Sequence, residues 1–133
     1  MQFSSIPTLV DAHILSLLEG TPLKGASLFL FVTSKSPLTL QDTNKVQLTA
    51  SVDDQQAHHQ SYDKIEEGTN VCLENVVVHV DFGKGHSVNR VDLSSKRVLT
   101  DIGSSSKEKE IKNFELKVTL NKLNGELPLA IST

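Results

Sequence analysis

The stretch LTLQDTNKVQLTASVDD, residues 38–54, decides how the middle of the chain folds. Leu38 and Leu40 alternate with polar residues, and after the polar segment DTNK (42–45) the alternation resumes. The apolar residues of the second run are Val46, Leu48, Ala50 and Val52. A period of two is typical of a strand with one buried face. The stretch therefore predicts a β-hairpin with one dry face, one wet face and a turn at 42–45.

Length and composition describe one ordinary globular domain. The chain has 133 residues, 38% hydrophobic and 22% charged, which suffices for one moderate core. No apolar run approaches the roughly 18 residues that a membrane-spanning helix needs, and the N-terminal residues do not have the pattern of a secretory signal. The one cysteine, Cys72, cannot form an internal disulfide, which favours a reducing compartment. We therefore expect no membrane association.

Charge is distributed unevenly, although the net charge is only −3. Residues 82–100 carry four basic side chains against one acidic, whereas residues 53–67 carry five acidic side chains against one basic. A local basic segment is what a nucleic-acid-binding surface requires. The alternative is chance scatter over a soluble surface.

Three further segments have strand character. GASLFLFVTS (25–34) is apolar on both faces, and TNVCLENVVVHVDF (69–82) changes phase near Glu74 or Asn75, where a β-bulge is predicted. The glycine-rich turn GKGH (83–86) leads into residues 87–102, read as one strand or as two strands broken by SSK.

Two segments are expected to be helical. Residues 8–19 place apolar side chains at helical spacing before Gly20 and Pro22, and these side chains are Val10, Ile14, Leu17 and Leu18. Residues 55–68 are polar and end at Gly68, which predicts a short helix or helical loop over one end of the sheet.

The order of elements predicts an all-β fold. Three strands, a helical segment, a long bent strand and a final strand are most economically closed as a β-barrel. Five antiparallel strands with a helix between the third and fourth form the pattern of the OB-fold. We therefore predict a five-stranded OB-fold with a short N-terminal helix over residues 1–103, and a C-terminal extension over 104–133 that packs on the barrel or on a partner.

From residue 38 to residue 103 the sequence resembles OB-folds of the replication protein A and telomere-capping class. The resemblance rests on an LxLxD strand ending at Asp42, a strand ending in acidic residues, the phrase IEEGxxVxLxN (65–75), a hairpin and a closing strand. With its apolar N-terminal segment (6–20), the chain is similar to the smallest subunit of replication protein A and to its counterpart in the CST telomere complex. The family adds a C-terminal helix that packs on a sister subunit. Here residues 114–120 have a strand period instead, and whether 104–133 form a strand or a helix stays open.

The resemblance implies where nucleic acid would bind. OB-folds bind single strands across the second and third strands and the flanking loops. The expected nucleic-acid-binding residues are Thr39, Gln41, Lys45, Gln47, Thr49, Phe82, Lys84, His86 and Arg90. The cations would neutralise phosphates and an aromatic ring would stack on a base. Because the two central strands carry no aromatic residue of their own, we expect weak or assisted binding.

A partner subunit is expected to contact apolar residues outside the core set. The candidates are Phe29, Phe31 and Phe114. For Phe29 and Phe31 the alternative is burial under the N-terminal helix. The resemblance implies that the partner is a larger OB-fold subunit.

Catalysis and metal binding find little support in the sequence. No nucleophile elbow or P-loop occurs, and Cys72 lies between two apolar residues of a strand, as core cysteines do. The five histidines have no cysteine partners at the spacings of zinc sites. We expect no enzyme activity, no cofactor and no metal.

Three functions are consistent with these features. The first is a non-catalytic OB-fold subunit of a single-stranded-DNA-binding complex in replication or telomere capping, which would be nuclear and chromosomal. The second is an autonomous binder of single-stranded DNA or RNA. The third is a β-barrel protein-interaction module that binds no nucleic acid.

Overall fold

The fold was analysed in a computed structural model of the chain. The structure describes residues 1–51, 64–83, 88–101, 108–111 and 116–121, and all structural statements refer to these residues. The predicted helix at 55–68 lies largely outside them, as do Lys84 and His86 of the predicted turn and Phe114.

The described residues form one helix and many strands, as the all-β prediction requires. The helix is α1 (Ile6–Glu19). The strands of the first half are β1 (Gln2–Phe3), β2 (Ser27–Lys35), β3 (Leu38–Gln41) and β4 (Gln47–Ser51). Those of the second half are β5 (Asn70–Glu74), β6 (Val77–Phe82), β7 (Val88–Ser95), β8 (Arg97–Asp101), β9 (Glu108–Ile111) and β10 (Leu116–Asn121).

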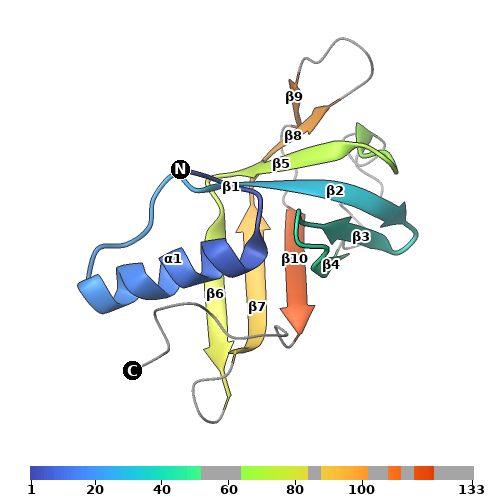
Figure 1. The fold of residues 1–133 in the computed structure, drawn as a ribbon. Coiled ribbons are helices and arrows are strands. Elements are labelled where there is room, and N and C mark those ends of the chain that lie inside the picture. The colour runs from blue at the N-terminus through green and yellow to red at the C-terminus, as the bar shows by residue number, and fades with distance from the viewer. Residues whose placement is uncertain (52–63, 84–87, 102–107, 112–115, 122–133) are drawn as a thin grey trace.

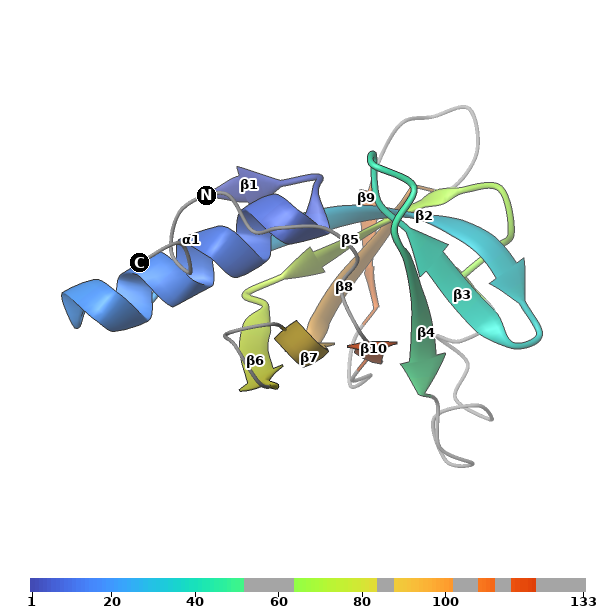
Figure 2. The same cartoon turned by 60° about the horizontal axis from the view of Figure 1, so that its bottom comes forward.

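The strands form one strongly curled sheet. Its order is β6-β7-β10-β4-β3-β2-β5-β8-β9, with β1 paired in parallel to β2. In this order β5 lies between β2 and β8, whereas β6, which follows β5 in the chain, is the strand at the opposite edge. The sheet must therefore curl to bring β6 close to β5, and it forms a half-barrel (Figure 1 and Figure 2). The fold is therefore an OB-like β-barrel, as predicted. Within the described residues, no helix is long and apolar enough to cross a membrane.

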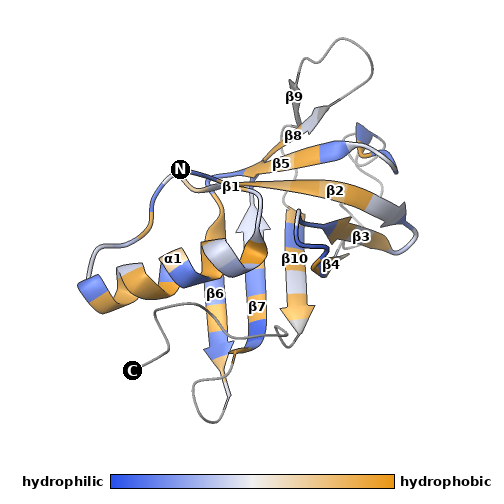
Figure 3. Cartoon of the chain, in the orientation of Figure 1, coloured by the Kyte–Doolittle hydropathy of each residue, from blue (hydrophilic) through white to orange (hydrophobic). Residues whose placement is uncertain are grey.

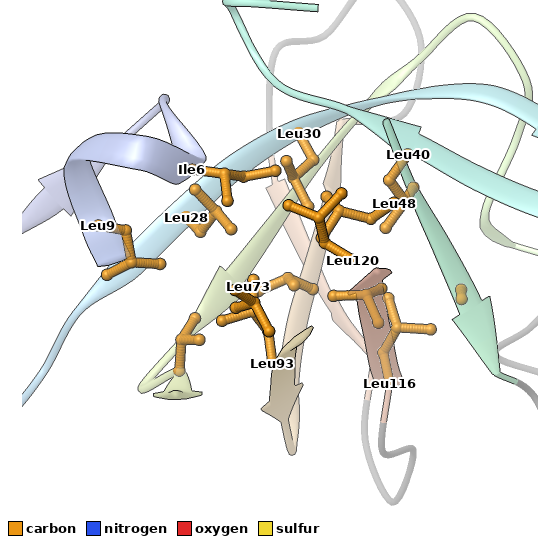
Figure 4. Packing of buried hydrophobic residues seen from close by; sticks show 14 of the residues in the cluster. Ile6, Leu9, Leu28, Leu30, Leu40, Leu48, Leu73, Leu93, Leu116 and Leu120 are labelled. Carbon is orange, nitrogen blue, oxygen red and sulfur yellow. The ribbon is translucent and has the colours of Figure 1, made fainter. Parts of the chain in front are cut away.

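The hairpin at 38–54 has the predicted alternation as far as it is described. Leu38, Leu40, Leu48 and Ala50 are buried, and the polar residues that alternate with them in the two strands, Thr39, Gln41, Gln47 and Thr49, are exposed or half-buried. The inward side chains of β2, β5, β7 and β10 meet them in the same core (Figure 4). The dry face of the hairpin is thus the lining of the barrel.

The strand β10 completes the sheet. It pairs with β4 on one side and with β7 on the other, and its residues Leu116, Val118 and Leu120 are buried. The strand period of this segment is therefore confirmed. The third and fifth strands of the predicted OB-fold, β4 and β7, are separated here by a strand from near the C-terminal end of the chain.

A sharp bend divides the long hairpin formed by β5–β6 and β7–β8. Asn75 has a positive φ of 51°, and Ser95 lies buried opposite it, with Oγ 2.7 Å from the Glu74 carbonyl oxygen and 2.8 Å from that of Arg97. A salt bridge of 3.0 Å joins Arg97 to Glu74 beside the bend. These contacts hold the two strands of the hairpin together at the point where both of them bend.

The predicted bulge at this bend is wrong in kind. Pairs run from Glu74 with Arg97 to Val77 with Ser94, so each strand contributes two residues between them and neither gains an extra one. Both strands change their buried phase at the same place. Both strands therefore bend at the same place without a bulge. The break that was predicted at SSK (94–96) is the bend in the second of these strands.

The N-terminal helix packs its first half against the barrel. Ile6, Leu9, Val10 and Ile14 are buried, and Gly20 ends the helix with a φ of 72°, as predicted. Leu17 and Leu18, which were predicted to lie on the apolar face, are 59% and 67% exposed. The end of the helix reaches beyond the sheet, so nothing in the described barrel covers them (Figure 1). Figure 3 colours the ribbon by hydropathy and shows apolar segments in the later turns of α1 and alternating bands on β6 and β10.

The β3–β4 turn anchors the start of α1. The buried carboxylate of Asp42 accepts hydrogen bonds from the backbone N–H groups of Ile6 (2.7 Å), Asn44 (2.9 Å) and Val46 (2.8 Å). Ile6 is the first residue of the helix, whose N–H has no partner within the helix. One aspartate therefore shapes the turn and caps the helix from 36 residues away.

Candidate nucleic-acid interface

The wet face of the hairpin lies on the outside of the half-barrel. Thr39 pairs with Thr49 and Gln41 with Gln47 across β3 and β4, and all four side chains are exposed or half-buried. Lys45 is exposed in the turn at a positive φ of 64°. The structure therefore brings these five predicted residues together on one outer surface.

A row of polar residues continues this surface across three further strands. Thr49 pairs with Thr119 of β10, Thr119 with Asp92 of β7, and Asp92 with His79 of β6. A parallel row runs from Ser51 through Lys117 to Ser94. We call this surface, on β3, β4, β10, β7 and β6, the outer polar face.

An aromatic ring borders the outer polar face. Phe31 of β2 pairs with Gln41 of β3 and is 42% exposed. The helix α1 therefore does not bury it. The sequence pattern assigned this surface no aromatic residue, but the register of β2 on β3 places Phe31 next to it.

A shallow pocket lies within the outer polar face. Its volume is about 350 Å³, within the range of small-ligand sites. Its polar lining comes from four strands and includes Ser51, His79, Arg90, Asp92, Lys117 and Thr119. Of the predicted binding residues that the structure describes, only Arg90 lines it.

Asp92 is the central charged group of this pocket. Its Oδ1 accepts hydrogen bonds from Arg90 Nε (3.0 Å) and Thr119 Oγ1 (2.8 Å). Partial burial acts to raise the pKa of this carboxyl group, but the two hydrogen bonds and the nearby charges of Arg90 and His79 outweigh it, so that the pKa is lowered. Asp92 is therefore ionised at neutral pH and holds the Arg90 side chain over β7.

The other predicted site residues lie elsewhere or are not described. Phe82, the last residue of β6, is 44% exposed but does not line the pocket. Phe29 is half-buried in β2 beside Cys72 of β5, which is itself buried. The polar pocket residues that the sequence pattern did not reveal are Ser51, His79, Asp92, Ser94, Lys117 and Thr119. For Lys117 and Thr119 the available signal was the strand period of 114–120. This period places them on the face of the strand opposite to that of Leu116 and Val118.

Two histidines lie near each other at the margin of this surface. Burial lowers the pKa of His13 on α1 below its ordinary 6.5, and the nearby charge of His79 lowers it further. The folded protein therefore binds a proton at His13 less readily than the unfolded chain does. This contribution to stability is full above the unfolded pKa and is lost as the pH falls below 6.5 toward the lowered pKa.

We expect the free energy of unfolding to decrease between about pH 7.5 and about pH 5, in part because of His13. Denaturant unfolding at both pH values, for the natural chain and for His13→Gln, measures this contribution. The decrease should be smaller in the variant, because glutamine takes up no proton. Equal pH dependence of the two proteins would contradict the assignment.

The described residues hold no cluster of three or more His, Cys, Asp or Glu side chains suited to a metal ion. Comparison with known proteins adds no assignment: no family model matches the sequence, and no match was found among curated proteins or solved structures.

Proposed function

We propose that this chain is a non-catalytic, OB-like subunit of a single-stranded-DNA-binding complex, with a modest DNA contact of its own. The observation that carries the proposal is the outer polar face, which combines hydroxyl and amide side chains, the cations Arg90 and Lys117, and the exposed ring of Phe31. Cations that neutralise phosphates and a ring that stacks on a base are the two requirements for binding a single strand. The resemblance to the replication protein A and telomere-capping class supports the same function, and with it a chromosomal location in the nucleus.

A larger OB-fold partner is part of this proposal. Leu17 and Leu18 continue the apolar side of α1 that carries Val10 and Ile14, and they are 59% and 67% exposed. An apolar surface of this kind is typical of a protein contact. Phe29 remains a candidate at such a contact, whereas Phe31 is assigned here to DNA.

Fluorescence anisotropy with labelled single-stranded DNA tests the DNA contact. We expect binding in the micromolar range that weakens markedly between about 50 mM and about 200 mM salt, because bound phosphates release counterions. The double variant Arg90→Glu with Lys117→Glu should abolish binding. Absence of binding by the natural chain up to high concentration would remove the direct contact from the proposal.

Phe31 and Phe82 form a matched pair for the stacking contact. They are 42% and 44% exposed, so truncation removes the same ring at nearly the same exposure from two different places. We expect Phe31→Ala to weaken DNA binding by about 1–3 kcal/mol, as for a lost base–aromatic stack. Phe82→Ala should have a clearly smaller effect, because Phe82 follows the inward phase of β6. Equal losses in the two variants would show that DNA does not follow the β3–β4 surface.

An autonomous single-strand binder is the second candidate, and Phe31 favours it because the ring supplies the stacking side chain that the sequence pattern did not reveal. Affinity separates the candidates. Tight binding by the isolated chain favours autonomous function. The subunit is favoured if binding is weak and tightens when a co-purifying OB-fold partner is added, and if Leu17→Asp with Leu18→Asp abolishes association with that partner.

A further inference from the structure

The pocket in the outer polar face contains an acceptor among donors. Arg90 and Lys117 bring two cations to it, while Asp92 brings a carboxylate whose Oδ1 is occupied by Arg90 Nε and Thr119 Oγ1. The other oxygen, Oδ2, accepts no hydrogen bond from the described residues. The Asp92 side chain is 36% exposed, so the carboxylate is in part accessible from solvent.

A site that served phosphate alone would not place a carboxylate at its centre. The negative charge of Asp92 repels phosphate and cancels part of the attraction of Arg90 and Lys117. The hydrogen bonds from Arg90 and Thr119 hold the carboxylate in a fixed position. It is thus arranged to accept a hydrogen bond from a ligand that also carries negative charge.

The surroundings of Asp92 suit a single nucleotide. Val77, 64% exposed, and the imidazole of His79 flank the pocket on β6 and offer surfaces against which a flat base can pack. Lys117 lies on β10, on the other side of β7, within reach of a backbone phosphate. A base on β6 and β7 and a phosphate over β10 would use each of these groups.

We propose that this pocket binds one nucleotide of a single DNA strand and that Asp92 Oδ2 selects bases that present an amino donor, so that cytosine is bound in preference to thymine. The inference rests on the proposed DNA contact and adds base selectivity to it. Cytosine offers the N4 amino group, whereas thymine offers the O4 acceptor at the same position. The carboxylate therefore accepts from cytosine and repels the O4 of thymine.

Anisotropy with oligo(dC) and oligo(dT) of equal length tests this selectivity, because the two strands have the same charge and similar base size. We expect oligo(dC) to bind about tenfold more tightly, the range of one well-placed polar contact to a base edge. In Asp92→Asn the ratio should fall to near one, since the amide offers a donor as well as an acceptor. Both strands should bind somewhat better, because a repulsive charge is removed.

Asp81→Asn is the matched control. Asp81 is an exposed aspartate on the same strand pair that does not line the pocket. The variant makes the same change in charge, so it should raise affinity for both strands slightly and leave the ratio unchanged. Thermal melts of both variants establish that they are folded.

Each outcome separates the inference from the function on which it rests. Equal binding of oligo(dC) and oligo(dT) by the natural chain would overturn the selectivity and leave the DNA contact intact. A preference that persists in Asp92→Asn would overturn the role of Asp92. No binding of either strand would overturn the DNA contact and the inference together.

Discussion

Replacing Val118 by aspartate is expected to unfold the protein or to lower its free energy of unfolding by more than about 4 kcal/mol, because an unpaired charge would enter the core. Val118 is fully buried in β10, where it pairs with Ala50 of β4 and Leu93 of β7. A total stability of about 5–15 kcal/mol is typical of such domains, so the loss would be a large share of it. Denaturant unfolding followed by circular dichroism measures the change.

Lys117→Asp is the control for this experiment. Lys117 is the preceding residue on the same strand and is exposed. An aspartate there enters water and should change stability by less than about 1 kcal/mol. Native-like stability of Val118→Asp would mean that β10 does not form part of the core, and that β4 and β7 meet in some other way.

Replacing Asp42 by alanine should have the second large effect, a loss of about 3–5 kcal/mol in the free energy of unfolding. The buried carboxylate, 5% exposed, accepts three backbone N–H groups, and alanine would leave them without an acceptor. Hydrogen bonds to a charged group contribute about 1.5–3 kcal/mol each, and losses within one network do not add fully. Thermal or denaturant unfolding measures the loss.

Two further variants, Asp42→Asn and Asp81→Ala, serve as comparisons for the loss in Asp42→Ala. Asparagine keeps one acceptor oxygen and should lose less than alanine does. Asp81 is exposed, and its removal should change stability by less than about 0.5 kcal/mol. If Asp42→Ala cost no more than Asp81→Ala, the turn would not anchor the helix in solution.

Much of the fold could be predicted because it depends on local periodicity. The alternation in 38–51 predicted which side chains of the hairpin face inward, the strand period of 116–120 is that of β10, and Gly20 marked the end of α1. The bend at Asn75 was located from a change of phase along one strand. Its nature was misread because one strand cannot show that its partner, around Ser95, changes phase at the same point.

Less of the candidate site could be predicted, because its residues are distant in sequence. Thr39, Gln41, Gln47 and Thr49 followed from the hairpin itself. Phe31 could be found only from the register of β2 on β3, since a two-residue shift would bring a different side chain beside Gln41. The exposure of Leu17 and Leu18 likewise depends on how far the barrel extends beneath α1. Helical spacing predicts the side of the helix on which a residue lies, but not whether another element covers that side.

The sequence by itself determined that this chain is a strand-rich OB-like domain that has a short N-terminal helix and a hairpin with a wet face. These features follow from side-chain periods of two and of 3.6, which are local properties of the backbone. Only the tertiary structure decided that β10 lies between β4 and β7, and that His79, Asp92, Thr119 and Lys117 share one pocket. Strand order and register come from pairing between segments far apart in the chain, and so does the chemistry of the surface they build.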